Sequence, residues 1–199
     1  GISTLRIEPQ FVAAIKRYFS GVRFDLVLYS TPPITLQKAV AYVKKRDGAA
    51  AYLLLKDIFP QNAVDLGMMS ATGLKAPLYR YFRGKEKRLY ALSDHIGCMS
   101  QANVDYVLKN NPEIPPYKVH VSPNSFEPQI VLEEPDRKKS LREKYRIPPD
   151  KTVFLYGGNL GRPQDVPFIL SCLQASRQVE EAFFVVCGNG TDYPRLAAY

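Results

Sequence analysis

Residues 24–55, FDLVLYSTPPITLQKAVAYVKKRDGAAAYLLL, contain two short apolar runs on either side of a longer amphipathic stretch. The runs at 24–29 and 50–55 have the length and composition of buried strands. Between them we expect a helix that begins at Pro33 and ends in the basic residues 44–46, which suit the negative end of the helix dipole. A strand, a helix and a second strand within about 30 residues predict a βαβ unit, and therefore a parallel sheet.

The same alternation continues along the chain. A helix is expected at 1–19, and a further strand is expected at 94–99. Ser100 then stands where it can cap a helix at 103–109, and the apolar residues of 118–121 follow as another strand. These elements predict that more strands join the same parallel sheet.

A change of composition separates this region from the end of the chain. Residues 127–150 carry four prolines and many charges around a short helical stretch at 136–145, which is typical of a linker. A second βαβ unit follows, with its elements at 152–156, 167–174 and 182–187. We therefore expect one domain at 1–126, a linker at 127–150 and the start of a second α/β domain at 151–199.

The composition bounds the class of protein. Hydrophobic residues make up 46% and charged residues 23%, which fits a globular protein with a sizeable core and excludes disordered and fibrous chains. The longest apolar run, 49–55, is too short to cross a bilayer, and the first residues lack a secretory signal, so we expect a cytoplasmic location. Cys98, Cys172 and Cys187 form no CxxC pair, so we read them as free buried thiols and expect no metal site.

The positive charge is confined to one half of the chain. Residues 1–100 hold 15 Lys and Arg against 7 Asp and Glu, which accounts for the whole net charge of +8. Such asymmetry favours an acidic partner: nucleic acid, an anionic membrane or a phosphorylated ligand. Within this half, residues 78–90 (LYRYFRGKEKRLY) interleave aromatic and basic side chains, as a membrane-surface helix does, although a helix with one solvated face is the favoured interpretation. We expect no nucleic-acid partner, because no RNA-recognition aromatic motif and no helix-turn-helix pattern is present.

Ligands of open parallel sheets bind beyond the carboxyl ends of the strands. Polar or glycine-rich residues follow each predicted strand here, and they are Ser30-Thr31, Lys56-Asp57, Ser100, Asn124, Gly157-Gly158-Asn159 and Gly188-Asn189-Gly190. Asp57 is a candidate general base or hydroxyl-binding carboxylate. Its position alone also fits a helix N-cap, which is the more frequent role for aspartate at such a place.

Residues 156–162, YGGNLGR, form the sharpest motif. Glycines after a strand let the backbone approach a ligand, a following helix N-terminus favours an anion, and Arg162 adds donors suited to a diphosphate. A tight turn with a solvent-facing arginine explains the same residues equally well. For CGNG at 187–190, a turn that requires positive φ is the favoured interpretation. Neither motif matches the dinucleotide-binding fingerprint or the P-loop.

Six segments in a fixed order carry a resemblance, namely FDLVLYSTPP, LLLKDIFPQ, KEKRLYALSDHIGCMS, VSPNS, VFLYGGNLG and FFVVCGNG. Together they resemble glycosyltransferase family 4, and within it the bacterial enzymes of lipopolysaccharide, O-antigen and capsular polysaccharide biosynthesis. The resemblance implies a GT-B fold, in which two Rossmann-like domains have parallel sheets with helices on both faces. The chain would then hold most of the N-terminal acceptor domain, without its first strands, and the start of the C-terminal donor domain.

The same resemblance implies metal-independent, retaining transfer of a sugar from a nucleotide sugar to a polyprenyl-diphosphate-linked cell-surface polysaccharide. It implies no cofactor, and a peripheral position on the anionic inner face of the cytoplasmic membrane. The donor-binding residues implied are Gly157, Gly158, Asn159, Arg162, Gly188, Asn189 and Gly190. The acceptor-side residues implied are Ser30, Thr31, Lys56, Ser100 and Asn124, with Asp57 as the candidate catalytic residue.

The sequence departs from the family pattern at several positions. Many relatives hold the donor diphosphate with an arginine and a lysine-glycine pair, where this chain has Asn159 and Gln164-Asp165; Arg162 is the candidate substitute. Many relatives carry a histidine where this chain has Lys56-Asp57. The family's N-terminal glycine-rich loop and C-terminal acidic donor motif would lie outside this chain, so we expect the chain alone to be inactive or nearly so.

A second hypothesis is a non-catalytic module that binds an anionic lipid or a polysaccharide. The incomplete second sheet argues against it, because an unfinished sheet exposes a strand edge that pairs or aggregates. The same edge would allow a homodimer to form.

Overall fold

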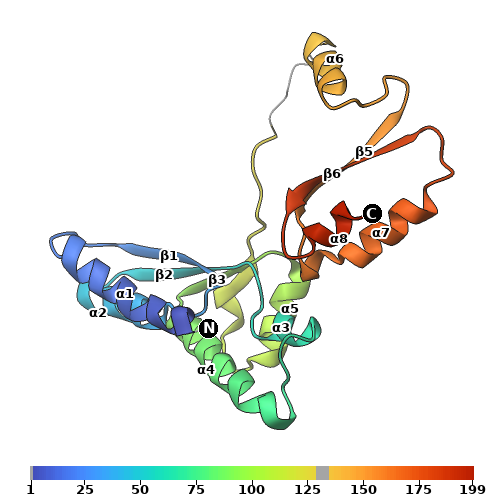
Figure 1. The fold of residues 1–199 in the computed structure, drawn as a ribbon. Helices are drawn as coiled ribbons and strands as arrows, with labels where there is room; N and C mark the ends of the chain where they lie inside the picture. Colours follow the sequence, from blue (N-terminus) through green and yellow to red (C-terminus); the bar gives the residue numbers. More distant parts are fainter. Residues whose placement is uncertain (1, 129–134) are drawn as a thin grey trace. The chain divides into compact units, whose positions relative to one another are not determined.

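The computed structural model describes residues 2–128 and 135–199, and the chain divides into two compact units, Gly1–Phe126 and Glu127–Tyr199 (Figure 1). In the described part of the first unit the strands are β1 (Leu26–Thr31), β2 (Ala50–Leu55), β3 (His95–Cys98) and β4 (Val119–Val121). Its helices are α1 (Ile2–Tyr18), α2 (Gln37–Asp47), α3 (Gln61–Asp65), α4 (Ala76–Leu92) and α5 (Gln101–Asn110), with short 3-10 turns η1 (Gly73–Lys75) and η2 (Pro116–Lys118).

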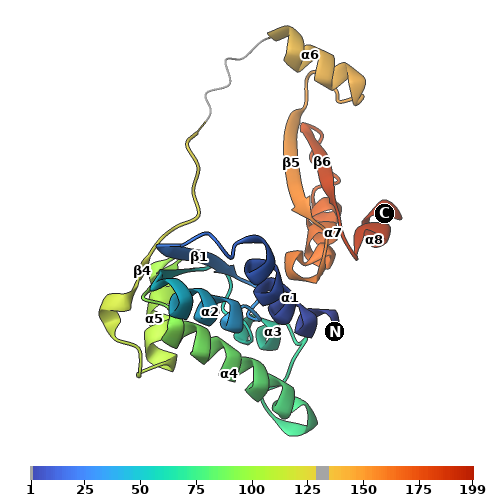
Figure 2. The same ribbon diagram turned by 90° about the vertical axis from the view of Figure 1, so that its left-hand side faces the viewer.

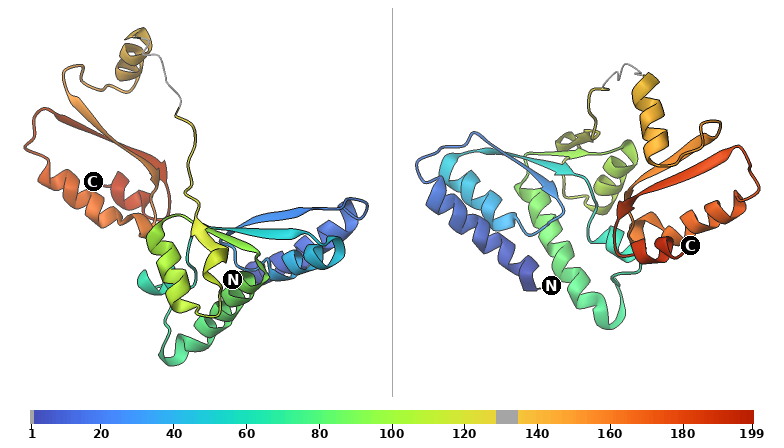
Figure 3. Two further views of the ribbon diagram at one scale, coloured as in Figure 1. Left: turned by 180° about the vertical axis from the view of Figure 1, so that it is seen from behind. Right: turned by 45° about the horizontal axis from the view of Figure 1, so that its top comes forward.

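The first sheet is parallel throughout, with the order β1-β2-β3-β4, so the predicted α/β fold is confirmed. Strand order equals chain order, and right-handed crossovers between successive parallel strands then place every connecting helix on the same side. Figures 1 and 3 show α1, α2 and α4 together beneath this sheet. On β2 alternate residues are buried, which matches one covered face and one open face.

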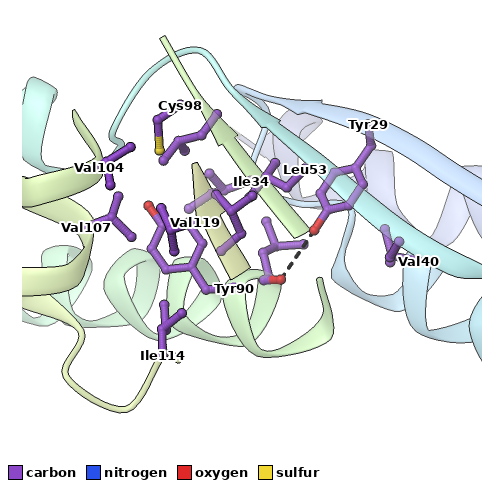
Figure 4. Close-up of a cluster of buried hydrophobic side chains, with 14 residues drawn as sticks. Tyr29, Ile34, Val40, Leu53, Tyr90, Cys98, Val104, Val107, Ile114 and Val119 are labelled. Carbon is purple, nitrogen blue, oxygen red and sulfur yellow. Dashed lines mark hydrogen bonds between the residues drawn. The ribbon is translucent and has the colours of Figure 1, made fainter. Parts of the chain in front are cut away.

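The core lies between the covered face of the sheet and the helices. Leu53, Ile96 and Val119 point into it from three neighbouring strands, and Val107 reaches it from α5. In Figure 4 the Tyr29 hydroxyl donates a hydrogen bond to the carbonyl of Leu89, which lies in α4. Burial raises the pKa of Tyr29 to about 12, so this hydroxyl stays protonated and fixes β1 against α4.

The first βαβ unit is present, but its boundaries differ from the prediction. The helix begins at Gln37 rather than at Pro33, because Ile34 and Thr35 are both buried and draw the preceding loop into the core. The strand begins at Leu26 rather than at Phe24, since the Phe24 N–H donates to the Asp47 carboxylate at 3.1 Å instead of to a strand. Gly48, with φ of 72°, ends the helix in the left-handed conformation that glycine tolerates.

Glu8 ties three helices together. One of its carboxylate oxygens accepts the backbone N–H of Lys38 in the first turn of α2 at 2.6 Å, and the other lies 3.1 Å from Lys85 Nζ of α4. Glu8 itself lies in α1 and is buried. Leu36, the residue at the N-cap of α2, has no side chain that can cap a helix, so Glu8 supplies the acceptor from elsewhere in the chain.

The second unit contains a parallel pair, β5 (Thr152–Asn159) and β6 (Ala182–Asn189). Its helices in the described residues are α6 (Pro135–Lys144), α7 (Val166–Ala175) and α8 (Tyr193–Ala197), with a 3-10 turn η3 (Arg162–Gln164). Figure 1 shows α7 running along the pair, and Figure 2 shows the same elements turned by 90°. The predicted second βαβ unit is therefore confirmed, and α6 is the short helix expected within 127–150.

The part of the chain that the structure describes contains neither a membrane-spanning helix nor a cluster of metal ligands. None of its helices has the length and apolar character needed to cross a membrane. In residues 2–128 and 135–199 no three His, Cys, Asp or Glu side chains are grouped closely enough to hold a metal ion.

The cysteines differ from the prediction of buried thiols. Cys98 lies in β3 and is buried, and burial raises the pKa of its thiol to about 11. Cys172 and Cys187 are exposed, because they lie on α7 and β6 of the second unit, where few residues are buried.

Candidate functional site

The four strands of the first sheet end in a single row. Thr31 pairs with Leu55, Leu55 with Cys98, and Cys98 with Val121. The residues after these four positions therefore emerge side by side, and adjacent strands of a sheet are about 5 Å apart. This carboxyl edge is the place where open parallel sheets bind ligands.

Lys56 and Asp57 emerge at the middle of the carboxyl edge, and both are exposed. Asp57 is not a helix N-cap, because α3 begins four residues later with Pro60 at its cap position. The Thr31 hydroxyl lies 3.4 Å from the Asp57 carbonyl oxygen, to which it donates, and Thr31 is 2% exposed. Thr31 thus holds the Asp57 loop against β1, while the Asp57 carboxylate faces outward.

The other predicted acceptor-side residues have different surroundings. Ser30 is half-buried and lies on the opposite face of β1 from Thr31. The Ser100 hydroxyl oxygen accepts the Asn103 backbone N–H at 3.3 Å, which makes Ser100 the cap of α5, as predicted. Asn124 is exposed in the extended segment that follows β4. The structure therefore brings Lys56, Asp57 and Ser100 to one edge, with Ser30 turned away from it.

Three further polar residues at this edge escaped the sequence analysis. In the described residues the buried side-chain atoms without a hydrogen-bond partner are Thr35 Oγ1, Gln37 Oε1 and Asn62 Oδ1. All three lie in the segments that follow β1 and β2. Buried polar atoms are nearly always paired, so unpaired ones at a sheet edge mark candidate contacts for a ligand or an ordered water. The sequence offered one signal for these residues, namely the polar side chains in TPPITLQ (31–37) and FPQN (59–62), which follow the two strands.

Gly157, Gly158 and Gly188 lie inside strands and Gly190 directly follows β6, which corrects the prediction of glycine loops after the strands. Gly157, Gly158 and Asn159 belong to β5, and they pair with Cys187, Gly188 and Asn189 of β6. Glycine weakens a strand but does not end it when a neighbouring strand continues the hydrogen-bonded ladder.

Two of these glycines are required by packing. A Cβ built on Gly188 would collide with the carbonyl oxygen of Gly158, and one built on Gly190 would collide with the carbonyl oxygen of Leu160. Gly190 is not among the glycines with positive φ, so the turn explanation for CGNG is wrong. Close approach of the two chain segments is the reason for glycine at both positions.

Gly157 differs from its neighbours. A Cβ built on it would meet no atom within 4 Å. Within the described residues, packing therefore gives no reason for glycine there, and the space remains open for a ligand.

A hydrogen-bonded loop follows β5. The Gln164 side-chain oxygen accepts from Asn159 Nδ2 at 3.1 Å and from the Gly161 backbone N–H at 3.3 Å. Leu160, which stands between Asn159 and Gly161 in the chain, is buried and anchors the loop. Arg162 is exposed and forms no ion pair with any described residue, so its guanidinium is available to an anion.

The chain matches none of the protein families with which it was compared. It is similar to the probable glycosyltransferase WbjE of Pseudomonas aeruginosa, with 26% identity over 187 residues. The similar region covers 93% of this chain, so it extends through both units, and 44% of that protein. The chain thus spans less than half the length of the curated relative that it matches.

Proposed function

We propose that this chain is part of a glycosyltransferase that moves a sugar from a nucleotide-sugar donor to a growing, polyprenyl-diphosphate-linked polysaccharide. The observation that carries the proposal is the similarity of 93% of the chain to a probable glycosyltransferase. The parallel sheets support it, because each has a carboxyl edge of the kind that binds ligands.

In this proposal the first unit takes the acceptor and the second takes the donor. The exposed Asp57 carboxylate binds a sugar hydroxyl at the carboxyl edge of the first sheet. The Arg162 guanidinium and the open backbone at Gly157 receive the donor diphosphate, because a planar fork of donors matches phosphate oxygens. The proposed scheme uses no metal ion, and in it the lipid-linked acceptor keeps the enzyme at the inner face of the cytoplasmic membrane.

The test is sugar transfer by the whole natural protein with a panel of nucleotide sugars, read as release of the nucleotide. Asp57→Asn is expected to lower kcat/KM for the acceptor about tenfold, since the hydrogen bond to the sugar hydroxyl loses the negative charge of its acceptor. Asp25→Asn is the matched control, because Asp25 is also exposed but lies at the amino end of β1. The 199-residue chain alone is expected to show no transfer above background.

Failure of the whole protein to use any nucleotide sugar would overturn the proposed function. Transfer by the isolated chain at the rate of the whole protein would contradict its expected inactivity. Equal losses in the Asp57→Asn and Asp25→Asn variants would remove the role given to Asp57.

Thr35 offers a test of the unpaired polar atoms at the edge. Thr35→Val is expected to raise the free energy of unfolding by about 1 kcal/mol, because it removes a buried hydroxyl that has no partner. Thr31→Val is the matched control: Thr31 is equally buried, but its hydroxyl donates to Asp57, so stability should fall. Hydrogen exchange of β1 and β2 reports both changes.

If the Thr35 hydroxyl contacts substrate, the stabilised Thr35→Val variant has a higher KM in the whole protein. A loss of stability equal to that of Thr31→Val would mean that the Thr35 hydroxyl already has a partner in the folded chain.

A further inference from the structure

Two asparagines stand next to each other at the carboxyl end of the β5–β6 pair. Asn159 and Asn189 are the last residues of their strands, and they are partners in the parallel register. Their side chains therefore leave the same face of the pair, from backbones about 5 Å apart. Both residues are exposed, and they are called the asparagine pair below.

The amide groups of the asparagine pair are oriented in opposite ways. Nδ2 of Asn159 donates to Gln164 Oε1 at 3.1 Å, which leaves its Oδ1 to accept. Oδ1 of Asn189 accepts the Gly190 backbone N–H at 2.8 Å, which leaves its Nδ2 to donate. Among the described residues, no hydrogen bond occupies either of these two remaining atoms. The pair therefore presents one acceptor and one donor side by side.

Gln164 fixes the orientation of the Asn159 amide. Gln164 Oε1 also accepts the Gly161 backbone N–H at 3.3 Å, and the Gln164 backbone N–H donates to the Gly161 carbonyl at 3.0 Å. A backbone N–H can only donate, so the Gln164 side chain must turn its oxygen, and not its nitrogen, toward Gly161. A reversed Asn159 amide would then set two oxygens against each other. The orientation of both asparagines thus derives from a backbone N–H.

Open space lies beside the asparagine pair on the same face. Gly157 precedes Asn159 by two residues, so a side chain at either position leaves the same face of the strand. A Cβ built on Gly157 would meet no atom within 4 Å. Arg162 lies inside the turn that Gln164 closes, is exposed and forms no ion pair with a described residue. A ligand over Gly157 can therefore reach both amides, with a cation in the adjoining turn.

We propose that the asparagine pair binds a vicinal diol of the donor, with Gln164 as its positioning residue. One hydroxyl donates to Asn159 Oδ1 and its neighbour accepts from Asn189 Nδ2, since a hydroxyl can do either. A nucleotide sugar carries hydroxyl pairs on both sides of its diphosphate, on the ribose and on the sugar, and Arg162 contacts the diphosphate between them. This inference rests on the proposed function, because it requires that the second unit takes the nucleotide sugar, and it adds the chemical group that is recognised.

The experiment is calorimetric titration of the whole natural protein with UDP, GDP and ADP, with their 2′-deoxy forms and with the corresponding nucleotide sugars. The variants are Asn159→Ala, Asn189→Ala and Gln164→Met. If the pair holds the ribose, each variant is expected to bind the nucleoside diphosphate about fivefold more weakly and its 2′-deoxy form as wild type does. If the pair holds the sugar, the nucleotide sugar is bound about fivefold more weakly and the nucleoside diphosphate is unaffected.

Two further glutamine variants separate positioning from a general effect on the loop. Gln164→Glu keeps an oxygen for both N–H groups, so the Asn159 amide stays oriented and the preference between the two probes stays that of wild type. Gln178→Met is the matched control, because Gln178 is an exposed glutamine between α7 and β6, at the amino end of the pair. Hydrogen exchange of β5 and β6 verifies that each variant is folded.

A loss confined to the probe that carries the diol, present in Gln164→Met and absent in Gln164→Glu and Gln178→Met, supports the inference. Equal losses for both probes, or wild-type binding by the Asn159→Ala and Asn189→Ala variants, overturn it. A change only in the preference between UDP and GDP also overturns it, and assigns the pair to the base. Absence of binding by every probe, together with absence of transfer, would instead mean that the proposed function itself has failed.

Discussion

Replacing Gly188 with alanine is expected to open the carboxyl end of the β5–β6 pair and to lower the stability of the second unit by about 3 kcal/mol. The added Cβ would collide with the carbonyl oxygen of Gly158, its partner in the register. A backbone atom cannot rotate away as a side chain can, so the two strands must separate. The Leu160 side chain, 3.1 Å from the same position, blocks movement to one side.

Gly157→Ala is the matched control, because its Cβ enters open space on the same pair of strands. Hydrogen exchange measured on peptides of β5 and β6 reports the second unit alone, and peptides of β2 and β3 serve as an internal reference. We expect protection in β5 and β6 to fall about 100-fold for Gly188→Ala and to change little for Gly157→Ala. Equal protection in the two variants would show that the strands approach less closely than described.

Glu8→Ala is expected to lower the stability of the first unit by about 3 kcal/mol. Glu8 and Lys85 have side chains that are 6% and 12% exposed, so removing the carboxylate leaves a largely buried ammonium without its ion-pair partner. The same change removes the acceptor for the Lys38 N–H at the start of α2. Both losses act on the contact between α1, α2 and α4.

Two comparisons isolate the cause of this effect. Glu8→Gln keeps an acceptor for the Lys38 N–H but removes the charge, so we expect about half the loss. Glu113→Ala breaks a surface pair, with Lys87, whose side chains are about half exposed, so we expect a loss below about 1 kcal/mol. Hydrogen exchange of β2 and β3 measures the loss of stability in the Glu8→Ala, Glu8→Gln and Glu113→Ala variants. A Glu8→Ala effect no larger than that of Glu113→Ala would contradict the buried pair.

Local patterns were enough to predict most elements of the fold. The strand at Ala50–Leu55 has the predicted boundaries, and Ser100 caps α5 as expected. Both features depend on residues next to one another in the chain: a run of apolar side chains, and a hydroxyl three residues before the N–H that it accepts. The predicted start of α2 was wrong: the helix begins at Gln37, four residues after Pro33. Burial of Ile34 and Thr35 in the core outweighs the preference of proline for a first helical turn.

The candidate site was less predictable. The sequence located the strand ends, and the register of the first sheet aligns them in one row. The sequence alone does not distinguish Gly188, which packing requires, from Gly157, which has open space around it. That distinction depends on which backbone atoms of a distant segment lie opposite each glycine. The unpaired oxygens of Thr35, Gln37 and Asn62 were missed for the same reason, because a partner's absence can be seen only after folding.

By itself, then, the sequence determined the α/β class, the parallel pairing and the excess of positive charge in residues 1–100. Those properties follow from the composition and from periodicity within short segments. Only the tertiary structure decided that Glu8 caps α2 and neutralises Lys85, and that Asp57 faces outward at a sheet edge. It also brought Asn159 and Asn189 side by side at the ends of β5 and β6. Contacts between residues far apart in the chain depend on how the helices pack on the sheet, and no local pattern encodes that packing.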